Sequence, residues 1–422
     1  MSTITLALVG AGERGQNCYA PHVLRNGQGM HFTAVAEPDE HRRNEFVAHY
    51  GVPSQNVFKT ADELFAAPRI ADAVLICTQD KQHYEHARAA ILKGYTVLLE
   101  KPISPSPQEC ISLQKLATKH GVTIVVCHVL RYTNIFKTIK KLLDDGAIGD
   151  IVSIVHTENI GYWHYAHSYV RGNWKSSADS SPMILAKCCH DLDILSWLIG
   201  SRCKSVSSFG DLRYFTKDNA PEGAPSRCLE GCPKSSTCPY YAPKMYMTGA
   251  KDWPASCLGP DLSEEGRRRA LMEGPYGKCV FSGENDVVDH QVASLLFENG
   301  VSVSFTASAF SNACERTMKI MGTTGEINVS TANNQVTLTE FGPGMRTGNT
   351  NTIKIVKSPY GHNGGDEGIM ENFAGVIRGF VPNENLFEQS VHSHIIAFAA
   401  EEARLTGEVV NLSEFEKTIL AD

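Results

Sequence analysis

The sequence predicts an α/β protein with two domains: a doubly wound parallel sheet, then an α/β domain with an open, mostly antiparallel sheet. Up to about residue 128, short apolar runs alternate with helix-like stretches, which is typical of parallel strands joined by right-handed crossovers. Later apolar runs follow one another through turn residues, which indicates antiparallel hairpins. We therefore expect one domain over residues 1–128 and a second over 129–422.

Apolar periodicity places the individual elements. In the first domain, strands are expected at 4–9, 32–36, 73–77, 96–99 and 123–127, and helices at 82–93 and 107–120. In the second domain, strands are expected at 151–157, 289–297, 301–307, 315–321, 325–329, 335–340 and 352–356, and helices at 135–145, 366–378 and 390–406. Residues near 209–285 are rich in Pro, Gly, Cys and Arg and lack periodicity, so they predict an irregular insertion.

The composition is that of an ordinary globular protein, with 42% hydrophobic and 20% charged residues in 422. A net charge of −7 argues against nucleic acid as the main partner. No apolar run reaches the ~18 residues of a membrane span, and no signal-peptide pattern precedes the first strand. We therefore expect a cytoplasmic protein, in which the 13 cysteines are reduced.

A glycine-rich turn follows the first predicted strand directly, with Gly10, Gly12 and Gly15 spaced as G-x-G-x-x-G. Such a turn lets main-chain N–H groups and a helix N-terminus approach a pyrophosphate. The second strand ends at Glu37, 22 residues after Gly15, where an acid can bind the ribose hydroxyls of NAD. Together these features predict dinucleotide binding; the alternative is a buried glycine turn with an incidental surface glutamate.

NAD is expected rather than NADP, because Glu37 would repel a 2′-phosphate. Arg42 and Arg43 are close enough in the sequence to leave this choice open.

Lys101 follows the 96–99 strand and so lies at the predicted cofactor edge of the sheet. The positive nicotinamide ring would disfavour its ammonium form, so its amine could exchange a proton with a substrate hydroxyl. The alternative is a surface ion pair with Glu100.

His190 lies in a stretch, 184–198, whose apolar spacing predicts one helix with Lys187, His190 and Ile194 on the same face. Imidazole titrates near neutrality, so His190 is a candidate acid or base. The alternative is a core histidine bonded to a carboxylate.

In combination these motifs resemble the Gfo/Idh/MocA oxidoreductases, the family of glucose–fructose oxidoreductase and inositol dehydrogenase. The resemblance covers most of the chain outside residues 209–285. It rests on the glycine turn, Glu100-Lys101-Pro102 and His190-Asp191-Leu192-Asp193, with support from Thr78 and His83, Arg131-Tyr132, and the segments 146–151 and 362–366.

The resemblance implies an N-terminal Rossmann domain, an open C-terminal sheet that mediates homo-oligomerisation as a dimer or tetramer, and Lys101 with His190 as the catalytic pair. The residues expected to contact the cofactor are Gly10, Gly12, Glu13, Arg14, Gly15, Glu37, Thr78, Gln79, His83, Glu100 and Lys101.

The chain departs from the family near the histidine. Many members carry an aspartate four residues before it, where this chain has Ala186 followed by Lys187. Asp191, Asp193 or the substrate would have to replace that carboxylate. Lys187 adds positive charge, which suits a sugar, cyclitol or glycoside with an anionic group; the alternative is that Lys187 handles a proton or binds a hydroxyl.

Aromatic residues before Arg171 suit a polyol pocket, because their rings stack on sugar faces; the alternative for each is a packed loop. The residues expected to contact substrate are Arg131, Tyr162, Trp163, His167, Arg171, Trp174, Lys187 and His362.

The predicted insertion holds a cysteine cluster. Three thiols within eleven residues, with Cys279 or Cys257 as a fourth, could form a tetrahedral structural zinc site, and free thiols are the alternative. The preferred ligands are Cys228, Cys232, Cys238 and Cys279.

We therefore expect an NAD(P)-dependent oxidoreductase that transfers a hydride at a secondary hydroxyl of a sugar-like substrate. One alternative is a redox-neutral, NAD-dependent glycosidase that passes through a transient keto-sugar. Another is an inactive, NAD-binding regulator.

Overall fold

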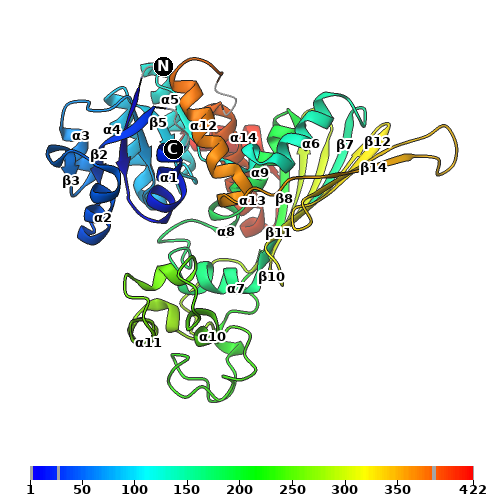
Figure 1. Ribbon diagram of the computed structural model, residues 1–422. Helices are drawn as coiled ribbons and strands as arrows, with labels where there is room; N and C mark the ends of the chain where they lie inside the picture. The colour runs from blue at the N-terminus through cyan, green and yellow to red at the C-terminus, as the bar shows by residue number, and fades with distance from the viewer. Residues whose placement is uncertain (1–2, 26–28, 383–385, 422) are drawn as a thin grey trace.

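The computed structural model describes residues 3–25, 29–382 and 386–421. Its first sheet has six parallel strands in the order β3-β2-β1-β4-β5-β6 (Figure 1). The strand order reverses between β1 and β4, which is where a doubly wound sheet opens a ligand crevice. The strands are β1 (Ile4–Val9), β2 (Met30–Ala36), β3 (Val57–Phe58), β4 (Ala73–Ile76), β5 (Thr96–Leu99) and β6 (Ile124–Val126).

Helices of the first unit begin and end where the sequence provides caps. In α5 (Pro107–His120) the Ser106 hydroxyl accepts a hydrogen bond from the Glu109 N–H, and Gly121 ends the helix in the left-handed region. The other helices are α1 (Ala20–Arg25), α2 (Glu40–Tyr50), α3 (Ala61–Ala66) and α4 (His83–Leu92), with a π-helix over Glu13–Tyr19 before α1.

One C-terminal helix packs into the core of the first sheet. The apolar face of α12 (Gly365–Ile377), which includes Ile369, Met370 and Phe373, joins a buried cluster with Leu8 and Leu75 of β1 and β4. The first sheet and the C-terminal part of the chain therefore share one core.

The second sheet has nine strands in the order β14-β13-β12-β11-β7-β10-β9-β8-β15. All of its pairings are antiparallel except that of β7 with β10, as expected for a mostly antiparallel sheet. Its strands are β7 (Ile151–Gly161), β8 (Cys203–Asp211), β9 (His290–Phe297), β10 (Ser302–Ser311), β11 (Glu315–Gly322), β12 (Gly325–Ser330), β13 (Gln335–Glu340), β14 (Asn349–Lys354) and β15 (Val410–Asn411).

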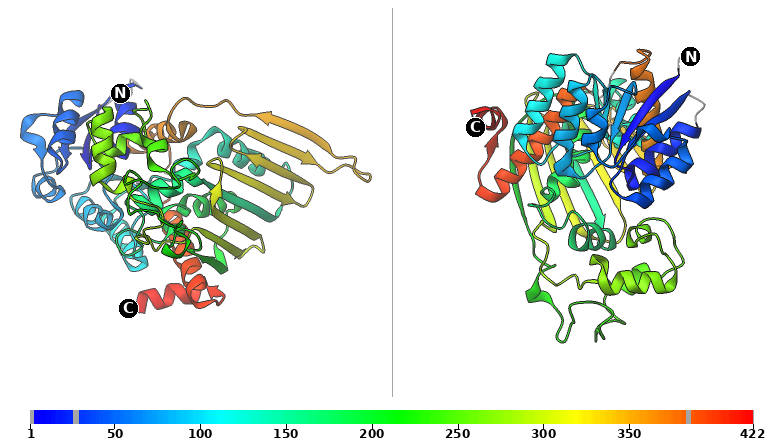
Figure 2. Two further views of the ribbon diagram at one scale, coloured as in Figure 1. Left: turned by 90° about the horizontal axis from the view of Figure 1, so that it is seen from below. Right: turned by 90° about the vertical axis from the view of Figure 1, so that its left-hand side faces the viewer.

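Helices lie over one face of this sheet, between it and the first unit (Figures 1 and 2). Along β9, buried residues alternate with exposed ones, so the opposite face is open. These helices are α6 (Asn134–Asp144), α8 (Met183–Ala186), α9 (Cys189–Ile199), α13 (Phe387–Thr406) and α14 (Leu412–Ala421).

The predicted single helix over 184–198 is wrong. It is broken between α8 and α9, where Lys187 and Cys188 have turn-like backbone angles. Lys187 therefore lies at a junction and not on the face of a continuous helix with His190.

The insertion, with α10 (Ala242–Tyr246) and α11 (Glu264–Glu273), forms a lobe below both sheets in Figure 1, together with α7 (Tyr162–Tyr165). Two arginines organise it: buried Arg267 donates to the Tyr246 carbonyl, and partly buried Arg227 donates to the carbonyls of Leu271 and Gly274 at the end of α11. Within the described residues, no helix combines the length and apolar character needed to cross a bilayer.

Candidate active site

The glycine turn has the shape of a phosphate-binding loop. Gly10 has φ +94°, and a Cβ there would meet the Cys77 carbonyl oxygen at 2.7 Å. A Cβ on Gly12 would meet nothing closer than Arg42 Nη1 at 4.0 Å, so this side of the turn is open to a ligand. The helix that begins at Glu13 leaves its first N–H groups without intrahelical partners.

Glu37 is buried beside this turn rather than on the surface. Its carboxylate accepts hydrogen bonds from the N–H groups of Ala11 (2.7 Å) and Asp39 (2.9 Å). The guanidinium of Arg42 lies 3.2 Å from it and is half exposed, whereas Arg43 is buried and donates to the Glu37 carbonyl. Of the two arginines considered for a 2′-phosphate, only Arg42 is therefore accessible.

The Arg14 side chain makes an ion-pair bridge between the two units. Its Nε lies 2.6 Å from Glu100 Oε1, and its Nη2 lies 2.8 Å from Asp366 Oδ1 of α12. Burial alone would raise the pKa of Glu100, but the charges of Arg14 and Lys101 outweigh it and lower that pKa. The predicted surface pair of Glu100 with Lys101 is thus replaced by a buried pair of Glu100 with Arg14.

Lys101 reaches across to the second unit. Its Nζ donates a 2.8 Å hydrogen bond to the main-chain carbonyl of Ala186, the last residue of α8. The loop that carries Lys101 is held by buried His83, whose ring nitrogens lie 2.6 Å from the Pro102 carbonyl and 3.0 Å from the Thr78 carbonyl. His83 therefore supports Lys101, and the Thr78 hydroxyl lies 3.1 Å from His86 Nδ1.

His190 follows Ala186, whose carbonyl binds Lys101, by four residues and is 8% exposed. Burial is the main reason that its pKa falls well below the usual value, and the charge of Lys101 is the next cause. Its Nδ1 has no hydrogen-bond partner among the described residues. The imidazole is therefore neutral near pH 7 and can accept or donate a proton.

The two carboxylates expected to replace the missing aspartate are both occupied. Asp191 is paired with Arg316 (2.7 Å) and His156 (2.7 Å). Asp193 binds Arg131 through two hydrogen bonds of 2.6 and 2.7 Å. Neither residue supports His190, and the predicted substrate-binding role of Arg131 is wrong for its guanidinium, which is buried in this pair.

Lys187 lies in a charged group above the second sheet. Its Nζ is 3.4 Å from Glu158 of β7, and Glu158 lies 2.8 Å from Arg316 of β11. Glu158 and Arg316 are site residues that the sequence analysis missed, because alternating polar residues in a strand give no signal of what they face. The positive charge of Lys187 is partly balanced here.

His362 approaches the same region, as expected. Its ring centroid is 6.4 Å from that of His190, and its Nδ1 lies 3.0 Å from Asp366. This links the loop before α12 with the Arg14 bridge.

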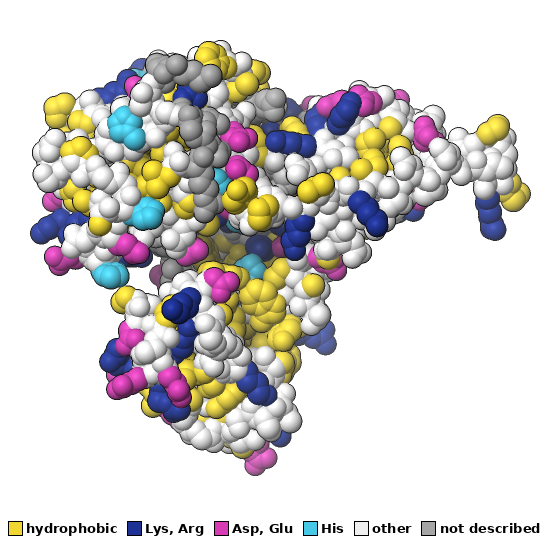
Figure 3. Space-filling view, viewed as in Figure 1, with side chains coloured by type: hydrophobic (Ala, Val, Ile, Leu, Met, Phe, Trp, Pro, Cys, Tyr) yellow, Lys and Arg dark blue, Asp and Glu magenta, His cyan; other side chains and the backbone are white. Residues whose placement is uncertain are grey.

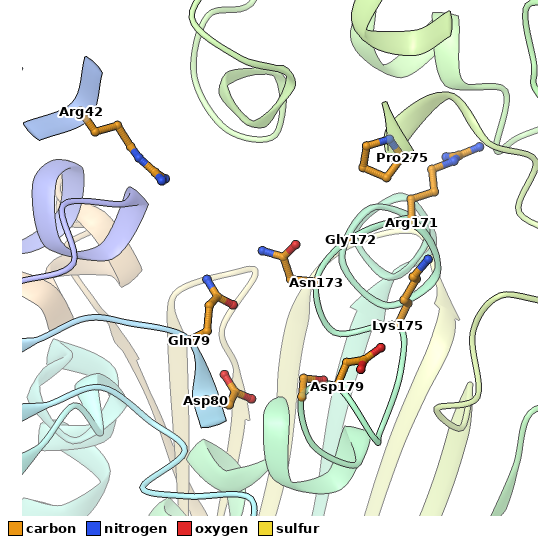
Figure 4. A pocket seen from close by; sticks show the side chains of 10 residues that line it. Arg42, Gln79, Asp80, Arg171, Gly172, Asn173, Lys175, Asp179 and Pro275 are labelled. Atoms are coloured by element: carbon orange, nitrogen blue, oxygen red, sulfur yellow. The ribbon is translucent and has the colours of Figure 1, made fainter. Parts of the chain in front are cut away.

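A cleft of about 520 Å³ lies between the first unit and the 171–180 loop (Figure 4). Arg42 and Asn173 point into it, and Gln79 lines it from the first unit. Arg171 also borders the cleft, but its guanidinium points away and donates to the carbonyls of Lys278 (2.8 Å) and Tyr240 (2.7 Å). Arg171 therefore anchors the insertion, and its predicted contact with substrate stays a prediction.

Trp174 closes one end of this region. Its Nε1 donates to Asp80 Oδ1 (3.3 Å), and the Ser181 hydroxyl donates to Asp80 Oδ2 (2.8 Å). Asp80 belongs to the first unit and is buried, so these bonds tie the loop to it.

The aromatic cluster divides into an open and a buried part. Tyr162 and Trp163 are half-buried, whereas His167 is buried against Tyr276 (ring centroids 4.7 Å) and lies 2.7 Å from the Tyr246 hydroxyl. His167 is thus a packing residue and not the substrate ligand predicted.

The structure does not support the predicted zinc site. Within the described residues no group of three or more His, Cys, Asp or Glu side chains could hold a metal ion. Burial is the main cause that raises the pKa of Cys238 and Cys279; a main-chain hydrogen bond lowers it, and the charges of Cys228 and Cys232 raise it further. Cys228 Sγ accepts the Ala242 N–H.

Family models match nearly the whole chain. The NAD-binding Rossmann-fold model of the GFO_IDH_MocA oxidoreductase family matches residues 4–128, and the model of its C-terminal α/β domain matches residues 140–412.

Among curated proteins, the oxidoreductase YteT of Bacillus subtilis is 25% identical over 343 residues, which is 77% of this chain and 76% of YteT. The 2,7-anhydro-N-acetylneuraminate hydratase of Mediterraneibacter gnavus is 27% identical over 50% of this chain and 53% of its own length. Inositol 2-dehydrogenase of Burkholderia multivorans is 26% identical over 47% of this chain and 55% of its own length. The chain thus spans about half the length of the last two.

Among solved structures, an oxidoreductase from Agrobacterium radiobacter in complex with NAD+, L-tartaric acid and magnesium aligns with a TM-score of 0.70. The alignment covers 98% of this chain and 100% of that one, at 15% identity. This similarity establishes the shared fold.

Proposed function

Since the chain belongs to the Gfo/Idh/MocA oxidoreductase family, we propose that it transfers a hydride between NAD and a secondary hydroxyl of a sugar, cyclitol or glycoside. The observation that carries the proposal is the hydrogen bond of Lys101 Nζ to the Ala186 carbonyl, which brings the amine of the first unit to the segment just before His190. The names of the inositol dehydrogenase and the anhydrosugar hydratase support a sugar-like substrate.

The residues of the first unit fit a dinucleotide. Gly12 leaves room for a pyrophosphate, and Glu37 has oxygen lone pairs for ribose hydroxyls beside the two N–H bonds that it accepts. We favour NAD over NADP because the Glu37 carboxylate lies next to Arg42, the one accessible arginine, and would repel a 2′-phosphate. Bound NAD supplies the hydride acceptor, and NADH the donor.

Lys101 of the first unit and His190 of the second supply the proton chemistry. In the oxidation direction, Lys101 accepts the proton of the substrate hydroxyl, and neutral His190 orients that hydroxyl through a ring nitrogen. The Ala186 carbonyl holds the Lys101 amine in place. Lys187 binds a hydroxyl or an anionic group of the substrate, with its charge tempered by Glu158.

A redox-neutral reaction is the second candidate, favoured by the similarity to a hydratase that acts on an anhydrosugar. Here the sugar would be oxidised transiently, a group eliminated, water added and the hydride returned. The two candidates use the same residues and differ in whether NADH accumulates.

The test is absorbance at 340 nm with a panel of neutral and acidic sugars, cyclitols and glycosides. Stoichiometric NADH would support the dehydrogenase, whereas product formation with catalytic NAD would support the redox-neutral reaction. Tight NAD binding without turnover of any panel member would contradict both and favour a regulator.

A further inference from the structure

Trp253 of the insertion reaches the aromatic residues beside the candidate active site. Its ring centroid lies 5.6 Å from that of Trp163 and 4.9 Å from that of His164. All three side chains are half-buried, so part of each ring surface remains available to a ligand. The sequence analysis did not identify Trp253, because it lies about 90 residues further along the chain in a segment without periodicity.

His164 connects this aromatic group with the reacting groups. Its Nδ1 lies 3.5 Å from Cys314 Sγ at the end of the second sheet. Burial is the main reason that the pKa of His164 lies well below its usual value, and the charge of Lys187 lowers it further. Trp163 and His164 directly follow β7, which carries Glu158, the partner of Lys187 at 3.4 Å, and Trp253 packs against both rings.

Trp253 is held rigidly from behind. His167 packs edge-on against it at 5.2 Å and is itself fixed by the Tyr246 hydroxyl and by stacking on Tyr276. Arg267 donates to the Tyr246 carbonyl and so anchors the segment that leads to Trp253. Such support lets a binding surface form before its ligand arrives, which lowers the entropic cost of binding.

The wall of the cleft on the insertion side is apolar. In Figure 3 hydrophobic side chains gather on the part of the insertion that faces the hollow between the two units, and His, Lys and Arg side chains lie deeper in it. A ligand that spans the hollow would thus meet charged groups at one end and aromatic rings at the other.

We infer that Trp253 and Trp163 form an aromatic subsite for the second carbohydrate ring of a glycoside whose first ring lies at Lys101 and His190. The C–H faces of a sugar pack on aromatic rings while its hydroxyls stay bonded to water or His164, so two half-buried tryptophans suit this ligand. The inference rests on the proposed function and adds that the substrate is larger than one sugar.

The test compares disaccharides of hexoses and uronic acids with their monosaccharides, using Trp253→Ala, Trp253→Phe and the control Trp197→Ala. Trp197 is another half-buried tryptophan, next to Arg131 and Lys140. We expect Trp253→Ala to lower kcat/KM for the disaccharide about tenfold and leave the monosaccharide unchanged. Trp253→Phe should restore most of the loss, and Trp197→Ala should affect neither substrate.

Equal losses on both sugars, or no loss on the disaccharide, would overturn the subsite while leaving the proposed function intact. If the wild-type protein turns over no sugar, the proposed function fails, and equilibrium binding of the disaccharides to the NAD-loaded protein decides the subsite alone. Weaker binding by Trp253→Ala would support it. Binding unaffected by Trp253→Ala, or no binding by the wild type, would overturn it.

Discussion

The Nζ of Lys101 lies 2.8 Å from the carbonyl oxygen of Ala186 and donates a hydrogen bond to it across the two units. A main-chain oxygen of the second unit thus orients the amine without adding a carboxylate charge beside it. The positive charge of Lys187, which follows Ala186 in the chain, is paired with Glu158 of β7 in the second sheet.

Lys101→Met should abolish most turnover. Removal of a general acid or base typically costs about 10²–10⁴ in kcat. Lys93→Met is the matched control, because Lys93 also donates to a carbonyl, that of Ala67, far from the site. Full activity in Lys101→Met would contradict the assignment of the amine.

The variant Lys187→Met distinguishes the two roles considered for this lysine, which are binding of an anionic group and handling of a proton or hydroxyl. If Lys187 binds an anionic group, kcat/KM should fall about tenfold or more on acidic sugars and little on neutral ones, because charge-assisted hydrogen bonds are the stronger kind. Lys187→Arg keeps the charge and should retain the preference for acidic sugars. An equal loss on both substrate classes would refute anion binding.

Arg14→Met should destabilise the fold as a whole. It removes one partner of buried Glu100 and Asp366, and an uncompensated buried charge costs about 3–5 kcal/mol. The free energy of unfolding in urea measures this loss. Arg88→Met removes an exposed pair with Glu85 and should cost less than about 1 kcal/mol; a similar cost for both variants would argue against the bridge.

Acid should weaken the insertion through His167, whose pKa burial lowers to about 4. The folded state holds the His167 ring neutral. The contribution of the neutral ring to the free energy of unfolding is therefore complete above the unfolded pKa of about 6.5 and is lost as the pH falls towards 4. The full difference in pKa between the unfolded and the folded state corresponds to about 3 kcal/mol of unfolding free energy. In His167→Phe, the unfolding free energy should fall less between pH 7 and pH 4.5 than it does in the wild-type protein. An equal fall in both proteins would refute the buried neutral state.

Local patterns in the sequence identified much of this molecule. Strands with continuous apolar runs, the glycine turn and the helix over 107–120 all depend on neighbours within a few residues, and the structure confirms them. The break at Lys187 was missed because α8 and α9 have the same apolar spacing on both sides of it.

The sequence was least informative where a side chain meets a distant partner. Arg131 binds Asp193, 62 residues away, and Arg171 binds the Lys278 carbonyl, 107 residues away. Both arginines were predicted to meet substrate, since a charge in a motif suggests a ligand. Their partners are set by packing, which no spacing in the chain reveals.

Asp80 of the first unit bonds to Trp174 and Ser181 of the second unit beside the cleft. These two bonds hold the loop that borders the cleft against the first unit, so the width of the cleft depends on how the two units are docked and not on the loop alone.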